Sequence, residues 1–294
     1  MNFINQINPL KDKISFSIFF IFTFLSFYLM FTNYPSEDAL ILFRYVENFS
    51  FNYEIAFNLN GEKTEGATDF LWFLILSIFN LFGINVVVSS IIINSFSLLI
   101  IIKFIKKYLV KNNNLIYYLF FIFLLLNIGS ICLSSLYGFS TLFFLCLGLL
   151  CYSSLLNKSY FNWTVFSILF CLTRPEGVLI FIPTILVLFF QTKKKEREKF
   201  FGSFLIISFV GLIYFLWRYY YFSNLLPLPL VVKNIGGETS LMRFFGITLQ
   251  ILNIFIFTLI LLCIYCLIKN YKKIFKNKQL IYSLIIIYFF WLIY

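Results

Sequence analysis

The feature that most constrains this chain is a series of long apolar runs separated by short basic segments. About 20 consecutive apolar residues are enough to span the hydrocarbon core of a bilayer as a helix. Hydrophobic residues make up 61% of the 294 residues, the mean hydropathy is +0.93, and only 12% of the residues are charged. Soluble domains do not have this composition. The sequence therefore predicts an all-α integral membrane protein, organised as a single polytopic domain over residues 1–294.

The lengths of the apolar runs predict about nine transmembrane helices. We expect these helices at residues 14–31, 84–102, 115–128, 139–156, 163–172, 178–190, 201–217, 244–268 and 280–294. Residues 70–82 are apolar but too short to cross a bilayer comfortably, so we interpret them as a shallow helix. The last run ends without a polar flank, which indicates that a C-terminal part is missing.

The distribution of charge predicts the orientation. The net charge is +11, and most of the 23 Lys and Arg residues lie in short segments such as 103–111, 193–199 and 269–278. The positive-inside rule places these segments, together with the N-terminus, in the cytoplasm. The same rule explains the excess of basic residues. We therefore expect no nucleic-acid partner. Most of the 12 acids fall on the opposite side, so we expect the chemistry there.

The long polar segment at 34–69 carries seven acids in an otherwise apolar half of the chain. Within it, Ser36 is a predicted helix N-cap, and Glu37 and Asp38 open an amphipathic helix whose dipole favours acids in the first turn. Arg44 lies seven residues after Glu37 and so on the same helix face, where it would pair with Glu37 or extend to the membrane surface.

Two interpretations of the Glu37 and Asp38 pair remain open at this point. The pair either decorates a helix end, or it supplies a general base, because a carboxylate beside a second acid has a raised proton affinity. Its oxygen atoms also suit a divalent metal ion. The chain has no His to serve as base or ligand.

Two further groups of charged residues lie next to apolar runs. Arg174 and Glu176 stand in an elbow between two short apolar segments, a placement that by default marks a functional site, although the two could simply pair with each other. Arg218 and Lys233 lie in a predicted external loop at 218–243. They either anchor the chain at the membrane interface or bind a lipid phosphate.

Several of these groups together match one pattern, in order along the chain. The chain resembles the polytopic glycosyltransferases of the GT-C class, in particular the arabinofuranosyl- and mannosyltransferase-like branch that uses polyprenyl-phosphate sugars. The matching motifs are Glu37-Asp38-Ala39 with Phe43-Arg44-Tyr45, Asn60-Gly61-Glu62 followed by Glu65-Gly66-Ala67-Thr68, Tyr137-Gly138, Thr173-Arg174-Pro175-Glu176-Gly177, and Trp217-Arg218-Tyr219-Tyr220-Tyr221 leading to Lys233. This chain departs from the pattern at Ser140, where the family usually has an acid.

The resemblance covers roughly residues 14–240 and implies a function. It implies a GT-C-like fold in the bacterial cytoplasmic membrane, with a helical extracytoplasmic loop at 33–69 that is catalytic. It implies an inverting sugar transfer from a polyprenyl-phosphate donor to a cell-envelope glycan or lipid acceptor at the outer face of that membrane, with the membrane lipids as further partners. On this reading Asp38, with its neighbour Glu37, is the catalytic carboxylate. The cations that hold the donor phosphate would be Arg44, Arg174, Arg218 and Lys233. The acids that position acceptor hydroxyl groups or orient those cations would be Glu65 and Glu176.

Two alternatives belong to other classes. The chain could be a transporter or flippase for a lipid-linked or anionic solute, with Arg174 and Glu176 at a break between half-helices forming a site near mid-membrane. It could also be an inactive remnant, which the loss of an acid at Ser140 would favour. A transporter should carry ionisable residues deep within several spans, whereas here the candidate site residues lie in predicted external loops.

Overall fold

The fold is taken from a computed structural model, which describes residues 2–32, 35–61, 63–66, 68–109, 134–191 and 194–224. Helices account for most of these residues, and no strand occurs in these ranges. The helices are α1 (Asn2–Thr32), α2 (Glu37–Asn52), α3 (Phe70–Leu81), α4 (Val86–Leu109), α6 (Thr141–Leu156), α7 (Tyr160–Thr173), α8 (Glu176–Gln191) and α9 (Lys194–Phe222).

Two of these helices are long and apolar enough to cross a membrane. They contain the stretches Val86–Phe104 in α4 and Arg197–Phe222 in α9. The helices α3, α6 and α7 are apolar but shorter, which agrees with the expectation of a short apolar helix at 70–82. The predicted spans 115–128, 244–268 and 280–294 lie outside the described residues. The structure thus supports a helical membrane protein. The number of about nine spans remains a prediction.

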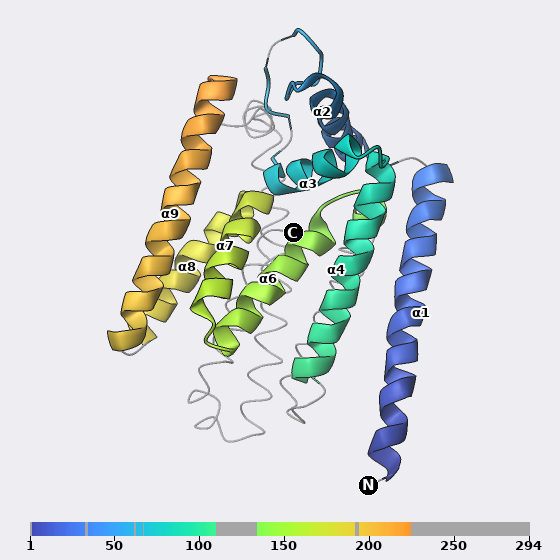
Figure 1. The fold of residues 1–294 in the computed structure, drawn as a ribbon, viewed down its shortest axis with the longest axis vertical. Helices are drawn as coiled ribbons and strands as arrows, with labels where there is room; N and C mark the ends of the chain where they lie inside the picture. Colours follow the sequence, from blue (N-terminus) through green and yellow to red (C-terminus); the bar gives the residue numbers. More distant parts are fainter. Residues whose placement is uncertain are drawn as a thin grey trace, which may run out of the picture.

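The helices form an elongated assembly with chemically different ends (Figure 1). The N-terminus, the C-terminal end of α4 and the start of α9 lie at one end. The helix α2 and the loop that follows it lie at the other end, where α3 runs across the direction of α4 and α9. Within the assembly, α1 packs on α4, α4 on α6, α6 on α7, and α7 on α9. The basic helix ends and the acidic loop are therefore on opposite sides.

The helix α2 confirms the predicted amphipathic segment. The side chain of Ser36 accepts a hydrogen bond from the backbone N–H of Ala39 at 3.4 Å, as expected of an N-cap. The buried face of α2 packs on α3, because residues three and four apart line one side of a helix. Together with the first residue of α4 the two helices form a hydrophobic cluster of Ala39, Leu42, Phe43, Tyr45, Val46, Trp72, Phe73, Leu76 and Val86. Burial of this face fixes α2 against α3 and the start of α4.

A tight turn at residues 137–140 connects α2 with the start of α6. The backbone N–H of Ser36 donates to the carbonyl of Tyr137 at 3.2 Å. Gly138 has a φ of +98°, and a Cβ there would lie 2.9 Å from Cζ of Phe43. Only glycine satisfies both conditions without strain. The close approach of this turn brings the N-terminus of α2 next to the segment that contains Ser140.

The predicted elbow at Arg174 is confirmed, whereas the predicted start of the second external loop is wrong. Arg174 is extended, with φ −147° and ψ 144°, between the end of α7 and the start of α8. By contrast, α9 continues through Arg218 to Phe222 and ends where Ser223 adopts a φ of +56°. Aromatic residues do not break a helix, and the charge of Arg218 is neutralised by a partner that the sequence does not reveal.

Candidate functional site

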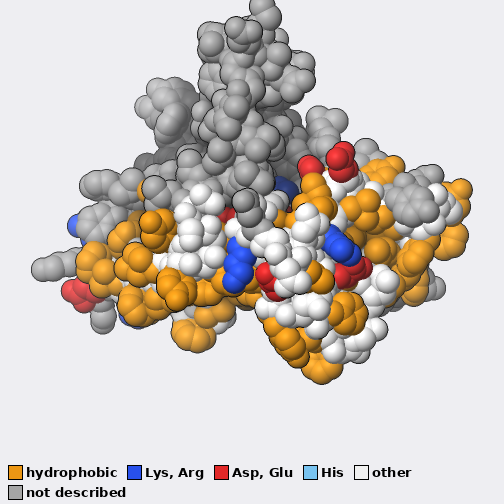
Figure 2. Space-filling model, turned by 90° about the horizontal axis from the view of Figure 1, so that it is seen from above, with side chains coloured by type: hydrophobic (Ala, Val, Ile, Leu, Met, Phe, Trp, Pro, Cys, Tyr) orange, Lys and Arg blue, Asp and Glu red, His pale blue; other side chains and the backbone are white. Residues whose placement is uncertain are grey.

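Charged side chains gather at the end of the molecule that carries α2. Figure 2, which views the molecule from that end, shows acidic and basic side chains side by side in the described part of the surface, with hydrophobic side chains around them. Two ion pairs lie at this end, and each joins the polar segment at 54–69 to an arginine more than 100 residues away in sequence. The polar segment is thus tied to α7–α8 and to α9.

The first pair joins Asp69 to Arg174. The Nε atom of Arg174 lies 3.3 Å from Oδ2 of Asp69, and the two side chains are 17% and 14% exposed. The hydroxyl of Ser140 donates to the same Oδ2 atom. Asp69 immediately precedes α3, Ser140 immediately precedes α6, and Arg174 lies in the α7–α8 break. Three helix boundaries therefore meet at one partly accessible carboxylate and guanidinium.

The second pair joins Glu65 to Arg218 and is more deeply buried. The Nε atom of Arg218 lies 2.5 Å from Oε2 of Glu65, and the side chains are 6% and 7% exposed, respectively. Burial raises the pKa of Glu65 above its ordinary value because it penalises the charged form, while the charge of Arg218 and its hydrogen bond act in the opposite direction. An ion pair that is buried to this degree holds its two side chains in one geometry.

Two tyrosines hold the polar segment in place. The Tyr45 hydroxyl donates to the carbonyl of Thr64 at 2.7 Å and accepts from the N–H of Gly66 at 3.0 Å. A Cβ at position 66 would lie 2.7 Å from that hydroxyl oxygen, so the approach requires glycine. On the other side, the Tyr221 hydroxyl accepts from the N–H of Ile55 at 3.0 Å. The segment is thereby fixed to both α2 and α9.

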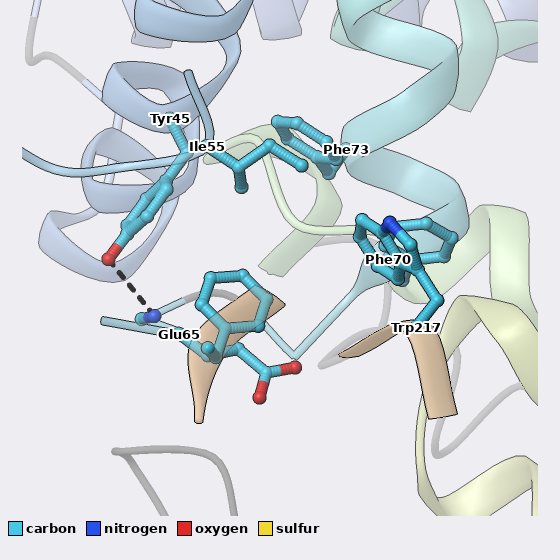
Figure 3. A pocket seen from close by; sticks show the side chains of 8 residues that line it. Tyr45, Ile55, Glu65, Phe70, Phe73 and Trp217 are labelled. Carbon is cyan, nitrogen blue, oxygen red and sulfur yellow. Dashed lines mark hydrogen bonds between the residues drawn. The ribbon is translucent and has the colours of Figure 1, made fainter. Parts of the chain in front are cut away.

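A pocket opens between this fixed segment, α2, α3 and α9. Its lining residues are Tyr45, Ile55, Glu65, Gly66, Phe70, Phe73, Trp217 and Phe222. In Figure 3 the side chain of Glu65 lies between Tyr45 on one side and Phe70 with Trp217 on the other. Phe70 is the first residue of α3 and follows Asp69 directly. The pocket and the Asp69–Arg174 pair therefore flank the same helix end.

The structure places the acids predicted as catalytic at the surface. Glu37 and Asp38 occupy the first turn of α2, and both are exposed, as is Arg44. None of the three makes an ion pair within the described ranges. The contact of Ser36 with Tyr137 joins this turn to the segment of Ser140. The two acids are thus connected to the Asp69–Arg174 pair through a single short turn.

The other predicted residues divide into two groups. Glu65, Arg174 and Arg218 take part in the ion pairs described above. Glu176 is half-buried in the first turn of α8, two residues after Arg174. Lys233 lies outside the described residues.

Sequence reasoning missed Asp69 and Ser140 as parts of the site. Asp69 was the last acid before an apolar helix, and such a position resembles an ordinary helix start. A signal was nevertheless present, because Arg174 stands between two apolar helices and a charge in such surroundings needs a partner. Ser140 stands where the resemblance expects an acid, and it instead donates to the carboxylate of Asp69.

Neither metal ligands nor known relatives add to this picture. Among the described residues, no three His, Cys, Asp or Glu side chains gather closely enough to hold a metal ion. Comparison with known proteins found no matching family model, no matching curated protein and no matching solved structure.

Proposed function

We propose that this chain is a membrane glycosyltransferase that moves a sugar from a polyprenyl-phosphate donor to a glycan or lipid acceptor at the outer face of a bacterial cytoplasmic membrane. The observation that carries the proposal is the partly accessible Asp69–Arg174 pair, at the end of the molecule that bears the exposed acids of α2. A guanidinium is suited to bind a phosphate oxygen through two parallel hydrogen bonds. Carboxylates at the same end of the molecule supply the base that an acceptor hydroxyl needs.

The proposed reaction is a single displacement. Asp38 takes the proton of the acceptor hydroxyl, and the oxygen atom attacks the anomeric carbon of the donor sugar. A new carbon–oxygen bond forms while the bond from that carbon to the phosphate oxygen breaks, so the anomeric configuration inverts. The lipid phosphate leaves with the bonding electrons, and Arg174 stabilises its charge. If the reaction uses a divalent metal ion, the carboxylates of Glu37 and Asp38 would hold it, because hard cations take oxygen ligands.

Neutral variants of the two candidate bases test these roles. In membranes that contain the chain and radiolabelled polyprenyl-phosphate sugars, Asp38→Asn should lower sugar transfer about 10²- to 10⁴-fold at unchanged protein level. The matched control is Glu47→Gln, which changes an exposed acid on the same helix and should leave transfer unchanged. Full transfer by Asp38→Asn with loss by Asp69→Asn would move the base from α2 to the start of α3.

One observation favours the alternative of a transporter. The α7–α8 break exposes part of Arg174 between two apolar helices, and broken helices line the substrate sites of many transporters. Transport would move an intact lipid-linked sugar and form no glycosidic bond. The two functions therefore differ in whether labelled sugar ends on a new acceptor.

A further inference from the structure

We propose that α3 lies along the outer surface of the bilayer and inserts the exposed apolar face at its C-terminal end into the lipid. This exposed face consists of Ile78, Leu81 and Phe82, which are 52%, 50% and 81% exposed, respectively. The three residues stand three and four positions apart and so share one side of the helix. Large apolar side chains that are exposed together mark a surface for a membrane or a partner protein.

The position of α2 gives the exposed face its direction. Phe73 and Leu76 belong to the hydrophobic cluster that α3 shares with α2, and the ring of Phe73 lies 5.4 Å from that of Phe49 on α2. At 3.6 residues per turn, Ile78 and Phe82 stand on the opposite side of α3 from these two residues. Because α2 and its loop form the outer end of the molecule (Figure 1), the exposed face is directed toward the membrane.

The turn between α3 and α4 fixes the depth of the exposed face. Gly83 adopts a φ of +79° and reverses the chain directly after Phe82. Two residues later, the side chain of Asn85 accepts a hydrogen bond of 2.8 Å from a backbone N–H in the first turn of α4. The membrane-spanning stretch Val86–Phe104 begins at this point. Phe82 therefore lies in the headgroup layer, which is about 5–7 Å thick on each side of the hydrocarbon core.

The length and composition of α3 fit a helix that lies on the bilayer. At 1.5 Å per residue its 12 residues extend over about 18 Å, which is too short to cross a core of about 30 Å. Figure 1 shows α3 running across the direction of α4 and α9. Residues 70–82 include no charged side chain, whereas a helix with one face in water carries polar residues there. Lipid is also the occupant that a surface continuous with a membrane span meets first.

This placement sets the depth of the Asp69–Arg174 pair. Asp69 directly precedes the first residue of α3, and a helix that lies along a surface keeps both of its ends at a similar depth. The pair is therefore held near the level of the lipid phosphates. The exposed face thus anchors the candidate site at the depth where a lipid-linked phosphate is presented, and only this last step rests on the proposed function.

Photocrosslinking identifies what covers the exposed face. The full chain carries the photoreactive residue p-benzoylphenylalanine in place of Phe82 and is reconstituted into vesicles of phosphatidylcholine and phosphatidylglycerol with radiolabelled acyl chains. Irradiation should attach labelled lipid to the chain, because the probe inserts into neighbouring C–H bonds. The same probe at Phe209, which is 64% exposed within the span of α9, should give a lipid adduct as well.

Tyr53 is the matched control, because it is an aromatic residue that is 76% exposed and follows α2 at the outer end of the molecule. The probe at Tyr53 should attach no more lipid than a sample kept in the dark. A crosslink from position 82 to a second copy of the chain or to another segment of the same chain, without labelled lipid, would overturn the inference. Equal lipid labelling at positions 82 and 53 would also overturn it.

The measurement separates the membrane anchor from the proposed function. Lipid labelling at position 82 in a protein that transfers no sugar would keep the anchor and contradict only the glycosyltransferase. A thermal melt identifies a variant that fails to fold, and the probe then takes the place of Leu81, on the same exposed face, with the same expected adduct.

Discussion

Replacing Arg218 by Met should destabilise the protein by about 3–5 kcal/mol, because the change leaves the carboxylate of Glu65 buried without its partner. The double variant Arg218→Met with Glu65→Leu should recover most of that loss, since it removes both charges from the apolar surroundings. Thermal unfolding of the detergent-solubilised protein measures both effects. The matched control Arg44→Met, at an exposed position on α2, should change stability by at most about 0.5 kcal/mol.

The loss caused by Arg218→Met should depend on pH in a defined direction. Burial raises the pKa of Glu65, and removal of Arg218 takes away the charge that opposes this effect. A buried carboxyl with a raised pKa stabilises the fold fully below its unfolded pKa, and this contribution is lost as the pH rises through the folded pKa. The deficit of the single variant should therefore be larger at pH 8 than at pH 5. A deficit that is independent of pH would show that lost packing, and not charge, causes the destabilisation.

Replacing Arg174 by Gln should lower sugar transfer about 10²- to 10³-fold, because the leaving phosphate loses its principal cation. Arg174→Lys should restore part of the rate, since it keeps the charge but not the two parallel hydrogen bonds. Initial rates over a range of donor concentrations separate a higher KM for the donor from a lower kcat. Arg197→Gln is the control, because Arg197 lies near the start of α9, at the opposite end of the molecule. Equal rates for Arg174→Gln and the wild type would remove Arg174 from the site.

Two local features of the fold, the cap of α2 and the break between α7 and α8, could be predicted from the sequence. Ser36 was expected to cap α2, and its side chain does so. The break at Arg174 followed from a charged residue and a proline between two apolar runs. The error at Arg218 has a physical reason: a charged residue in a run of aromatics resembles the end of a membrane span, whereas a buried partner lets the helix continue. Local patterns cannot show where such a partner is.

The ion pairs of the site could not be predicted for the same reason. Asp69 and Arg174 are 105 residues apart, and Glu65 and Arg218 are 153 residues apart. Each pairing depends on how α3, α7 and α9 pack against one another. Local patterns in the sequence do not reveal that packing. What the sequence did indicate was an imbalance of charge, with acids concentrated in the segment at 34–69 and isolated cations in apolar surroundings later in the chain. That imbalance predicts that partners exist without identifying them.

The most direct test of the proposed function measures transfer and transport in the same vesicles. The purified chain is reconstituted into lipid vesicles with a donor carrying radiolabelled sugar and an acceptor-lipid extract. The label in new glycosidic bonds and the label moved across the bilayer are then counted separately. We predict label on the acceptor, lost in Asp38→Asn, without net movement of intact donor. Movement of intact donor across the bilayer with no label on any acceptor would contradict the glycosyltransferase and identify the chain as a transporter.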